Sequence, residues 1–462
     1  MPRVASPPPA LTGEAGRAAR IYYVISGLYT LSASLIWGVN TLFLLDAGLN
    51  IFETFVANSV FTAAMVAFEI PTGVLADTKG RRISFLLSLV VLLASTLGYV
   101  ALAESGGGVL AFSLVSVVMG IGFTLYSGAV EAWVVDALRA VGYDGSLDGL
   151  FAKGAIVTGG AMLLGTVGGG FLGTVDLSLP YLVRSGLLVA TFVVALAAMH
   201  DVGFTPRPVT LGHLGAEMRK VGRAGVTWGW QEPRLRLLVF ASFIQMGFLM
   251  WGWYAWQPYF LELLGSEAVW VAGTIAAAAA LATMLGNGMV EFLGRYCARR
   301  STLLILASLV SSAAIVMVGL AGSFWVAVAS FLVSMVAFGV LQPVKQALLH
   351  KLVPSEHRAT VVSFDSMFGN AGGIVGQTGL GALGQRTSIA DGYVVGGVLT
   401  LIAVPIFARL RKVGMAYDLG CEPSPEPQTT AAQGLPEICT VDTVVSVPAA
   451  VGAGSEGSET GT

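Results

Sequence analysis

The sequence is short of charged residues, since Asp, Glu, Lys and Arg fill 11% of its 462 positions, against roughly 25% in soluble globular domains. A soluble protein needs charged side chains to keep its surface hydrated, so a soluble globular fold is excluded for most of this chain. In contrast, 55% of the residues are hydrophobic and 59 are glycines. Because small residues let helices approach closely inside a bilayer, this composition predicts an all-α membrane protein.

Several other features are missing. The three cysteines, Cys297, Cys421 and Cys439, have neither the spacing of metal ligands nor that of a disulfide framework. The chain lacks the Gly-x-x-x-x-Gly-Lys-Ser/Thr loop that cradles phosphates, which argues against an ATP-driven pump. It has no basic face suited to nucleic acid and no nucleophile–base set, so we expect no catalytic residue, metal or cofactor. The N-terminus lacks the pattern of a cleavable signal peptide.

The chain contains long apolar segments of the kind that a membrane protein needs, since a helix needs about 20 apolar residues to cross a bilayer. We identify twelve such segments, six in each half of the chain: 22–45, 51–75, 83–103, 109–135, 152–173, 179–200, 236–263, 268–293, 302–321, 323–346, 361–384 and 390–410. If both ends are cytoplasmic, every Lys and Arg except Arg184 and Arg386 falls on the inner side. Such an excess of positive residues is typical of the cytoplasmic side, so we predict cytoplasmic termini in the plasma membrane of a prokaryote.

The two halves resemble each other, which predicts two pseudo-symmetric six-helix bundles. The loop after the second helix of each half carries an acid and then Gly-Arg: Asp77 with Gly80-Arg81, and Glu291 with Gly294-Arg295. Internal repeats of this kind are typical of transporters. The expected regions are an N-terminal cytoplasmic tail (1–20), the first bundle (21–201), a cytoplasmic linker with an amphipathic helix (202–235), the second bundle (236–412) and a disordered cytoplasmic tail (413–462).

The loop after the second helix carries the most specific motif. It reads Gly73-Val74-Leu75-Ala76-Asp77-Thr78-Lys79-Gly80-Arg81-Arg82. Gly80 permits a tight turn, and the arginines suit the positively charged inner surface. An acid and a base placed here can pair across a helix junction and hold one conformation closed. The alternative is a positive loop that merely sets the topology.

This stretch closely resembles the loop signature of the major facilitator superfamily, Gly-x-Leu-x-Asp-x-x-Gly-Arg-Arg. The resemblance implies two bundles around a central cavity, alternating access and a monomer. It also implies that Gly73, Asp77, Gly80, Arg81 and Arg82 stabilise the outward-facing state. Further segments resemble bacterial drug-efflux members: Phe68–Gly73, Ser127–Asp136, Trp256–Tyr259 and Pro354–Thr360. The fourth helix lacks the arginine that proton-coupled drug antiporters of the superfamily often carry there.

Charged residues within the apolar segments are candidates for function, because charge inside a bilayer is expensive. Glu131 and Asp136, toward the inner end of the fourth helix, could face Arg81 or Arg82 and extend the gate; a static ion pair is the alternative. Glu53, near the outer end of the second helix, is the candidate for proton coupling, since partial burial favours the protonated form of a carboxyl group. An interfacial carboxylate reached by water is the alternative.

Polar and aromatic residues within the segments are candidates for the lining of a substrate cavity. Aromatic rings could stack on a flat or lipophilic substrate, although four aromatic residues in 251–256 cannot all face one way on a helix. Some of them therefore belong to an aromatic belt at the membrane surface. The candidate lining residues are Trp37, Asn40, Asn58, Gln245, Trp253, Trp256, Gln257, Asn370 and Gln377.

We therefore expect a secondary active transporter of small organic solutes that works by alternating access. Its partners would be a small-molecule substrate, protons as the coupling ion and the lipid bilayer. Proton-coupled efflux of lipophilic compounds is the leading hypothesis. One alternative is uptake or facilitated diffusion of a polar nutrient such as a sugar, and another is a membrane sensor or scaffold that transports nothing.

Overall fold

The computed structural model describes residues 12–205, 223, 230–266, 268–297, 299–353, 358–413 and 418. The predicted linker helix lies outside this part of the chain, and so does the predicted C-terminal tail apart from residues 413 and 418. Ten helical stretches of the described part are long and apolar enough to cross a membrane. With α1–α2 and α14, which cover the first and eleventh predicted segments, they account for all twelve.

The first half folds into one bundle. Its helices are α1 (Gly13–Ser34), α2 (Asn40–Asp46), α3 (Ile51–Lys79), α4 (Arg81–Ser105), α5 (Val109–Tyr126), α6 (Ala129–Ala140), α7 (Asp148–Val175) and α8 (Leu179–Ala198). Its core is apolar and aromatic and includes Tyr29, Phe43, Phe85 and Phe112.

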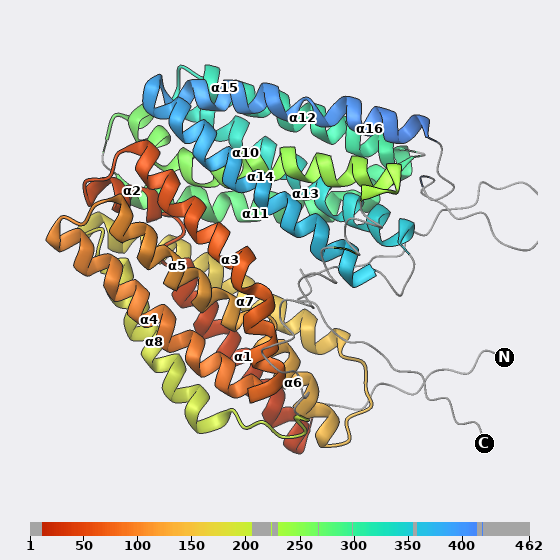
Figure 1. Ribbon diagram of the computed structural model, residues 1–462. Coiled ribbons are helices and arrows are strands. Elements are labelled where there is room, and N and C mark those ends of the chain that lie inside the picture. Colours follow the sequence, from red (N-terminus) through yellow and green to blue (C-terminus); the bar gives the residue numbers. More distant parts are fainter. Residues whose placement is uncertain are drawn as a thin grey trace, which may run out of the picture.

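The second half folds into the other bundle. Its helices are α10 (Pro233–Leu264), α11 (Val269–Tyr296), α12 (Arg300–Leu320), α13 (Phe324–Leu352), α14 (Arg358–Arg386), α15 (Ile389–Thr400) and α16 (Ala403–Lys412). Figure 1 shows the two bundles side by side, with the first half in red to yellow and the second in green to blue.

Three predicted segments are broken into two helices each. The first divides into α1 and α2, the fourth into α5 and α6, and the twelfth into α15 and α16. Between α5 and α6 the backbone leaves helical geometry at Ser127 and Gly128, and Gly128 has a φ of 70°. Glycine takes positive φ without steric cost, so this residue makes the break possible.

The first helix starts earlier than the apolar segment that the sequence indicated. It begins at Gly13 and not near residue 22, so most of the predicted tail that the structure describes is helical. Ala15, Ala18 and Ala19 are buried on one face of this extension. This extension is amphipathic, and Arg17 and Arg20 interrupt its apolar residues, so it does not form a continuous apolar run in the sequence.

The two bundles meet at one end, which we call the joined end, and spread apart toward the other, the diverging end. Figure 1 shows α2 between the bundles at the joined end, whereas α6 and α16 lie far apart at the diverging end. At the joined end the ring of Phe55 on α3 stacks on that of Trp251 on α10, with centroids 5.8 Å apart. The backbone N–H of Ile51 donates to Gln385 of α14 over 3.0 Å.

Candidate functional site

The turn between α3 and α4 lies at the diverging end and is built around Gly80. This residue has a φ of 111°, in a region that side chains strongly disfavour. A Cβ here would also collide with the carboxylate of Asp201. That carboxylate instead accepts a hydrogen bond from the backbone N–H of Arg82 over 3.0 Å. The glycine thus lets the start of α4 approach the chain that leaves α8.

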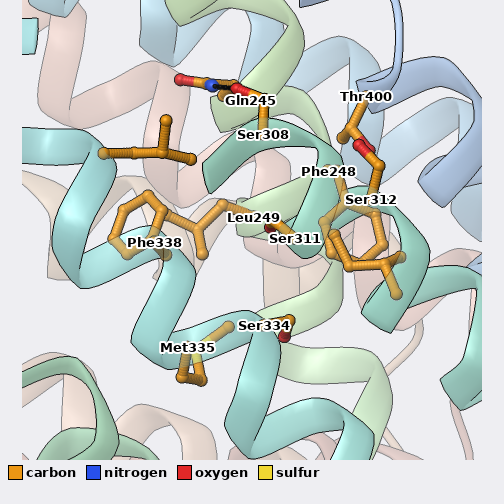
Figure 2. Close-up of a pocket in the computed structure, with 12 residues that line it drawn as sticks. Gln245, Phe248, Leu249, Ser308, Ser311, Ser312, Ser334, Met335, Phe338 and Thr400 are labelled. Atoms are coloured by element: carbon orange, nitrogen blue, oxygen red, sulfur yellow. Dashed lines mark hydrogen bonds between the residues drawn. The ribbon is translucent and has the colours of Figure 1, made fainter. Parts of the chain in front are cut away.

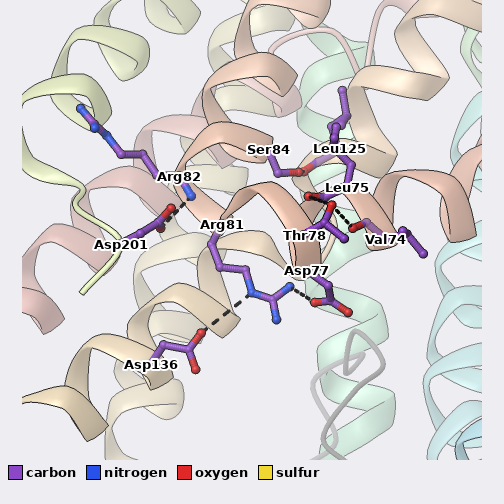
Figure 3. A network of polar contacts seen from close by, with 10 residues as sticks. All are labelled: Val74, Leu75, Asp77, Thr78, Arg81, Arg82, Ser84, Leu125, Asp136 and Asp201. Atoms are coloured by element: carbon purple, nitrogen blue, oxygen red, sulfur yellow. Dashed lines mark hydrogen bonds and ion pairs between the residues drawn. The ribbon is translucent and has the colours of Figure 1, made fainter. Parts of the chain in front are cut away.

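Ion pairs connect this turn to α6, as Figure 3 shows. The guanidinium of Arg81 lies 2.5 Å from a carboxylate oxygen of Asp77 and 3.9 Å from one of Asp136. Arg82 donates from its guanidinium to the carbonyl of Leu196 on α8 over 2.7 Å. The side chains of Asp77, Arg81 and Asp136 are between 23% and 30% exposed. We call Asp77, Arg81 and Asp136 the ion-pair cluster; all three belong to the first bundle.

Gly73, the first glycine of the motif, has open space beside its Cα in this conformation. A Cβ built on it would meet no heavy atom within 4 Å, and Phe68 and Glu69, one turn earlier on α3, are exposed. The contacts described above between α3 and α14 involve Ile51, near the joined end. This half of α3 therefore presents a face that the second bundle does not cover.

Glu131 lies apart from the ion-pair cluster. It forms no ion pair with Arg81 or Arg82 among the described residues, and its Oε2 is enclosed without a hydrogen-bond partner. The neighbours on which its charge acts are tyrosines: Tyr22, Tyr29 and Tyr126. Asp136 thus reaches Arg81, as the sequence suggested it could, while Glu131 is a separate, partly buried carboxyl group.

Gln257 of α10 joins the two bundles at the break between α1 and α2. Its Oε1 accepts a hydrogen bond from the backbone N–H of Thr41 over 2.9 Å. Its Nε2 donates to the carbonyl of Trp37 over 2.9 Å. The side chain is fully buried, so it satisfies backbone groups that the interrupted helix leaves without partners.

Three further hydrogen bonds involve predicted cavity residues. Asn40 donates to Asn58 over 3.1 Å and accepts from the hydroxyl of Tyr181 over 3.0 Å. Gln377 of α14 donates to Thr62 of α3 over 3.4 Å. The Nδ2 of Asn58 and the Oε1 of Gln377 remain enclosed without partners. These amides therefore retain hydrogen-bonding capacity inside the protein.

Glu53 has a local role at the start of α3. Its carboxylate accepts a hydrogen bond from the backbone N–H of Asn50 over 3.0 Å, and the Asn50 side chain accepts from the N–H of Glu53 over 2.9 Å. This reciprocal capping box satisfies two backbone donors at the helix start. A role of Glu53 in proton coupling stays a prediction.

The aromatic residues of α10 point in different directions, as helical geometry requires. Trp251 is fully buried and stacks across to Phe55 of the other bundle. Trp256 is 2% exposed and packs on Phe331 within the core of the second bundle. Trp253 is partly exposed.

A buried ion pair in the second bundle joins α10, α13 and α14. The ammonium of Lys345 lies 3.3 Å from a carboxylate oxygen of Asp365 and 2.6 Å from the hydroxyl of Ser242. That hydroxyl also bonds to Asp365. The Lys345 side chain is only 6% exposed. The sequence signal for this pair was the presence of one lysine and one aspartate in two predicted apolar helices of the second half.

A small hydroxyl-lined cavity lies inside the second bundle, shown in Figure 2. The space open to the centre of a water molecule measures about 30 Å³, which is enough for ordered water. Gln245 lies at its wall and donates weakly to Ser308 over 3.5 Å. Asn370 is partly buried on α14 and does not line this cavity. The polar lining is Gln245, Ser308, Ser311, Ser312, Ser334 and Thr400.

Arg184 of α8 is one of the two basic residues that the sequence leaves on the outer side. It is 1% exposed and lies inside the first bundle. Its guanidinium carbon is 5.8 Å from the centre of the Phe123 ring on α5. Among the described residues, no three His, Cys, Asp or Glu side chains gather as they would around a metal.

Comparison with known proteins identifies the family to which this fold belongs. The family model of the Major Facilitator Superfamily matches residues 22–377 and 271–448. The fold resembles that of the nucleoside transporter NupG, with a TM-score of 0.71, 14% identity and coverage of 86% of this chain and 99% of that one. It also resembles a peptide transporter of the POT family, with a TM-score of 0.65, 15% identity and coverage of 85% and 95%.

A third similar structure is the human organic anion transporter MFSD10, with a TM-score of 0.57, 14% identity and coverage of 86% of this chain and 100% of that one. No curated protein sequence matches. The family match extends over most of the chain, and the two bundles have the arrangement of solved members. The chain therefore belongs to the major facilitator superfamily, as an integral membrane secondary transporter of small solutes and not an enzyme.

Proposed function

We propose that this protein is a proton-coupled exporter of small organic compounds that have a large apolar or aromatic part. The orientation comes from charge: the turn with Lys79, Arg81 and Arg82 and the end of α16 lie at the diverging end. Positive residues favour the cytoplasmic side. The diverging end then faces the cytoplasm, and this conformation receives substrate from inside the cell.

The aromatic surface of the first bundle carries the proposal for the substrate. Tyr29 of α1 stacks on Tyr126 of α5 with ring centroids 3.5 Å apart, and Phe123 meets Phe61 of α3 edge to face at 5.3 Å. Tyr126, Phe123 and Phe61 are only partly buried. Partly exposed aromatic rings suit the binding of flat apolar molecules.

Proton coupling requires a carboxyl group whose protonation is linked to the conformational change. Glu131 suits this role because its Oε2 is enclosed without a hydrogen-bond partner and the residue forms no ion pair among the described residues. Glu53 remains the sequence-based candidate, at the opposite end of the first bundle. We assign the coupling first to Glu131 and second to Glu53.

The decisive experiment follows a neutral lipophilic dye, Nile red, out of preloaded cells that express the protein. We expect protein-dependent dye loss that a proton uncoupler stops. Glu131→Gln should remove the uncoupler-sensitive part, and Glu53→Gln should leave most of it. The reverse order would return the coupling to Glu53. Dye loss that is independent of the protein, or insensitive to the uncoupler, would refute proton-driven export.

A second candidate function is uptake of a polar solute. It is favoured by the enclosed Nδ2 of Asn58 and Oε1 of Gln377, two amide atoms without a hydrogen-bond partner, because a sugar or similar molecule could satisfy them. Radiolabelled solute uptake into cells, compared between the natural protein and Asn58→Leu, tests this candidate. Uptake that Asn58→Leu abolishes would favour it over export.

A further inference from the structure

Arg184 is a buried cation without a counter-charge. It is 1% exposed, and none of the ion pairs among the described residues includes it. Its Nε and Nη1 are enclosed and have no hydrogen-bond partner. Removing a charge from water without pairing it is costly, and in a membrane bundle such a residue is by default functional.

The surroundings of Arg184 are aromatic and come from four helices. Tyr29 of α1, Tyr99 of α4 and Tyr181 of α8 are its electrostatic neighbours, and Phe123 of α5 lies beside the guanidinium. Aromatic faces attract a guanidinium, but they do not satisfy its N–H groups. These aromatic residues form a cage that holds the cation in place and leaves two of its donor atoms, Nε and Nη1, unsatisfied.

Two of the three tyrosine hydroxyl groups in this cage have a hydrogen-bond partner, and the third has none. The hydroxyl of Tyr99 pairs with that of Ser116 over 2.6 Å, and that of Tyr181 donates to Asn40 over 3.0 Å. The hydroxyl of Tyr29 has no partner. The free groups around Arg184 are thus its own Nε–H and Nη1–H and one phenol, all of which can donate a hydrogen bond to an anion.

From this arrangement we infer that Arg184 binds the carboxylate of an aromatic organic acid, with Tyr29 as a second donor and the partly exposed rings of Phe123 and Tyr126 against the body of the molecule. This inference rests on the proposed function and specifies its substrate class. A guanidinium and a carboxylate form two parallel charge-assisted hydrogen bonds, which are stronger than neutral ones. A neutral amide of the same shape cannot replace the charge.

An internal partner is the rival explanation. Glu131 is the candidate partner, but among the described residues it forms no ion pair with Arg184. If the two side chains paired in another conformation, neutralising both would cost less stability than neutralising Arg184 alone.

The test compares acids with their amides on purified protein. Thermal denaturation is followed with indole-3-acetate and salicylate, each against its amide, and with sodium chloride and phosphate at equal concentration. We expect both carboxylates to stabilise the natural protein and the amides and inorganic salts to do little. Three results would overturn the inference. The amide could stabilise the protein as much as its acid, the inorganic anions could do so equally well, or neither acid could stabilise it up to the limit of its solubility.

Variants then locate the site. Arg184→Lys keeps the charge but not the two-pronged geometry, so it should weaken the carboxylate effect, and Arg184→Gln should abolish it. Arg386→Gln, at the exposed end of α14, is the matched control and should change nothing. A carboxylate effect that survives in Arg184→Gln overturns the inference. So does a loss of stability in Arg184→Gln that Glu131→Gln restores without any added acid.

The proposed export function and the proposed carboxylate site at Arg184 can be refuted independently. Nile red carries no charge, so its export by the Arg184→Gln variant should persist if the aromatic surface alone carries the dye. Loss of carboxylate binding with intact dye export would identify Arg184 as the anion anchor. Where Arg184→Gln does not fold, the comparison of acid and amide on the natural protein still decides the matter.

Discussion

Gly170 of α7 and Gly273 of α11 meet across the two bundles so closely that a Cβ added to Gly170 would lie 2.8 Å from the Cα of Gly273. Close backbone approach through small residues is how membrane helices pack tightly. This contact lies between helices of different halves. It can form only while the joined end is closed, so it belongs to one conformation of the transport cycle.

Gly170→Val should therefore oppose closure of the joined end. Overpacking costs roughly 1–3 kcal/mol, which corresponds to a shift of about 5- to 150-fold between two conformations. We expect transport to fall while membrane insertion stays normal. Gly186→Val is the matched control, because a Cβ at Gly186 on α8 meets nothing within 4 Å. Transport rates in proteoliposomes provide the measurement, and an equal effect of both variants would contradict the argument.

Asp77→Asn should impair transport and leave the protein folded. The Asp77–Arg81 pair is partly exposed, and such pairs contribute only about 0–1 kcal/mol to stability. Its loss nevertheless frees Arg81 from one of its two carboxylates and changes the gate. The control is Glu291→Gln, which breaks the corresponding pair with Arg295 of the second half, 3.1 Å long and more exposed. Flux and denaturation temperature should be measured for both variants; unchanged flux in Asp77→Asn removes the gate role.

The helices and the motif were predictable from sequence because each leaves a linear signal. Twelve apolar runs follow from bilayer thickness, and the acid, glycine and arginines of the motif are neighbours along the chain. The pairing of Arg81 with Asp136 was one of the suggested contacts, and it is present. The breaks were not predicted, because apolar residues continue on both sides of Gly128 and hide the change in backbone.

The burial of Arg184 was not predicted, for a different reason. The sequence puts Arg184 on the outer side, whereas its burial depends on which face of α8 turns toward α1 and α5. An apolar helix gives no periodic signal for that face, since lipid and bundle interior are equally apolar. The same ambiguity placed Trp256 among cavity residues, although it packs within the second bundle.

The Lys345–Asp365 pair should behave as one unit. Removing one partner of a buried pair costs about 3–5 kcal/mol, whereas replacing both with apolar residues is often neutral. Lys345→Met and Asp365→Leu should each lower the denaturation temperature, and the double variant should recover most of it. Denaturation of the purified proteins tests this through a double-mutant cycle. Additive losses would mean that the two side chains do not depend on each other in the folded protein.

Gly80→Ala should destabilise the turn between α3 and α4, whereas Gly73→Ala in the same motif should not. An alanine at position 80 would hold a φ of 111° and collide with Asp201, and strained backbone conformations cost about 1–3 kcal/mol. Position 73 has open space around it and lies within α3. Adding Asp201→Ala to Gly80→Ala removes the collision but not the strain, so it should restore part of the lost denaturation temperature. Complete recovery of the denaturation temperature would show that backbone strain contributes little to the loss. No recovery would show that backbone strain, and not the collision with Asp201, causes it. Equal stability of Gly80→Ala and Gly73→Ala would refute both causes and leave the motif glycine without a structural requirement in this conformation.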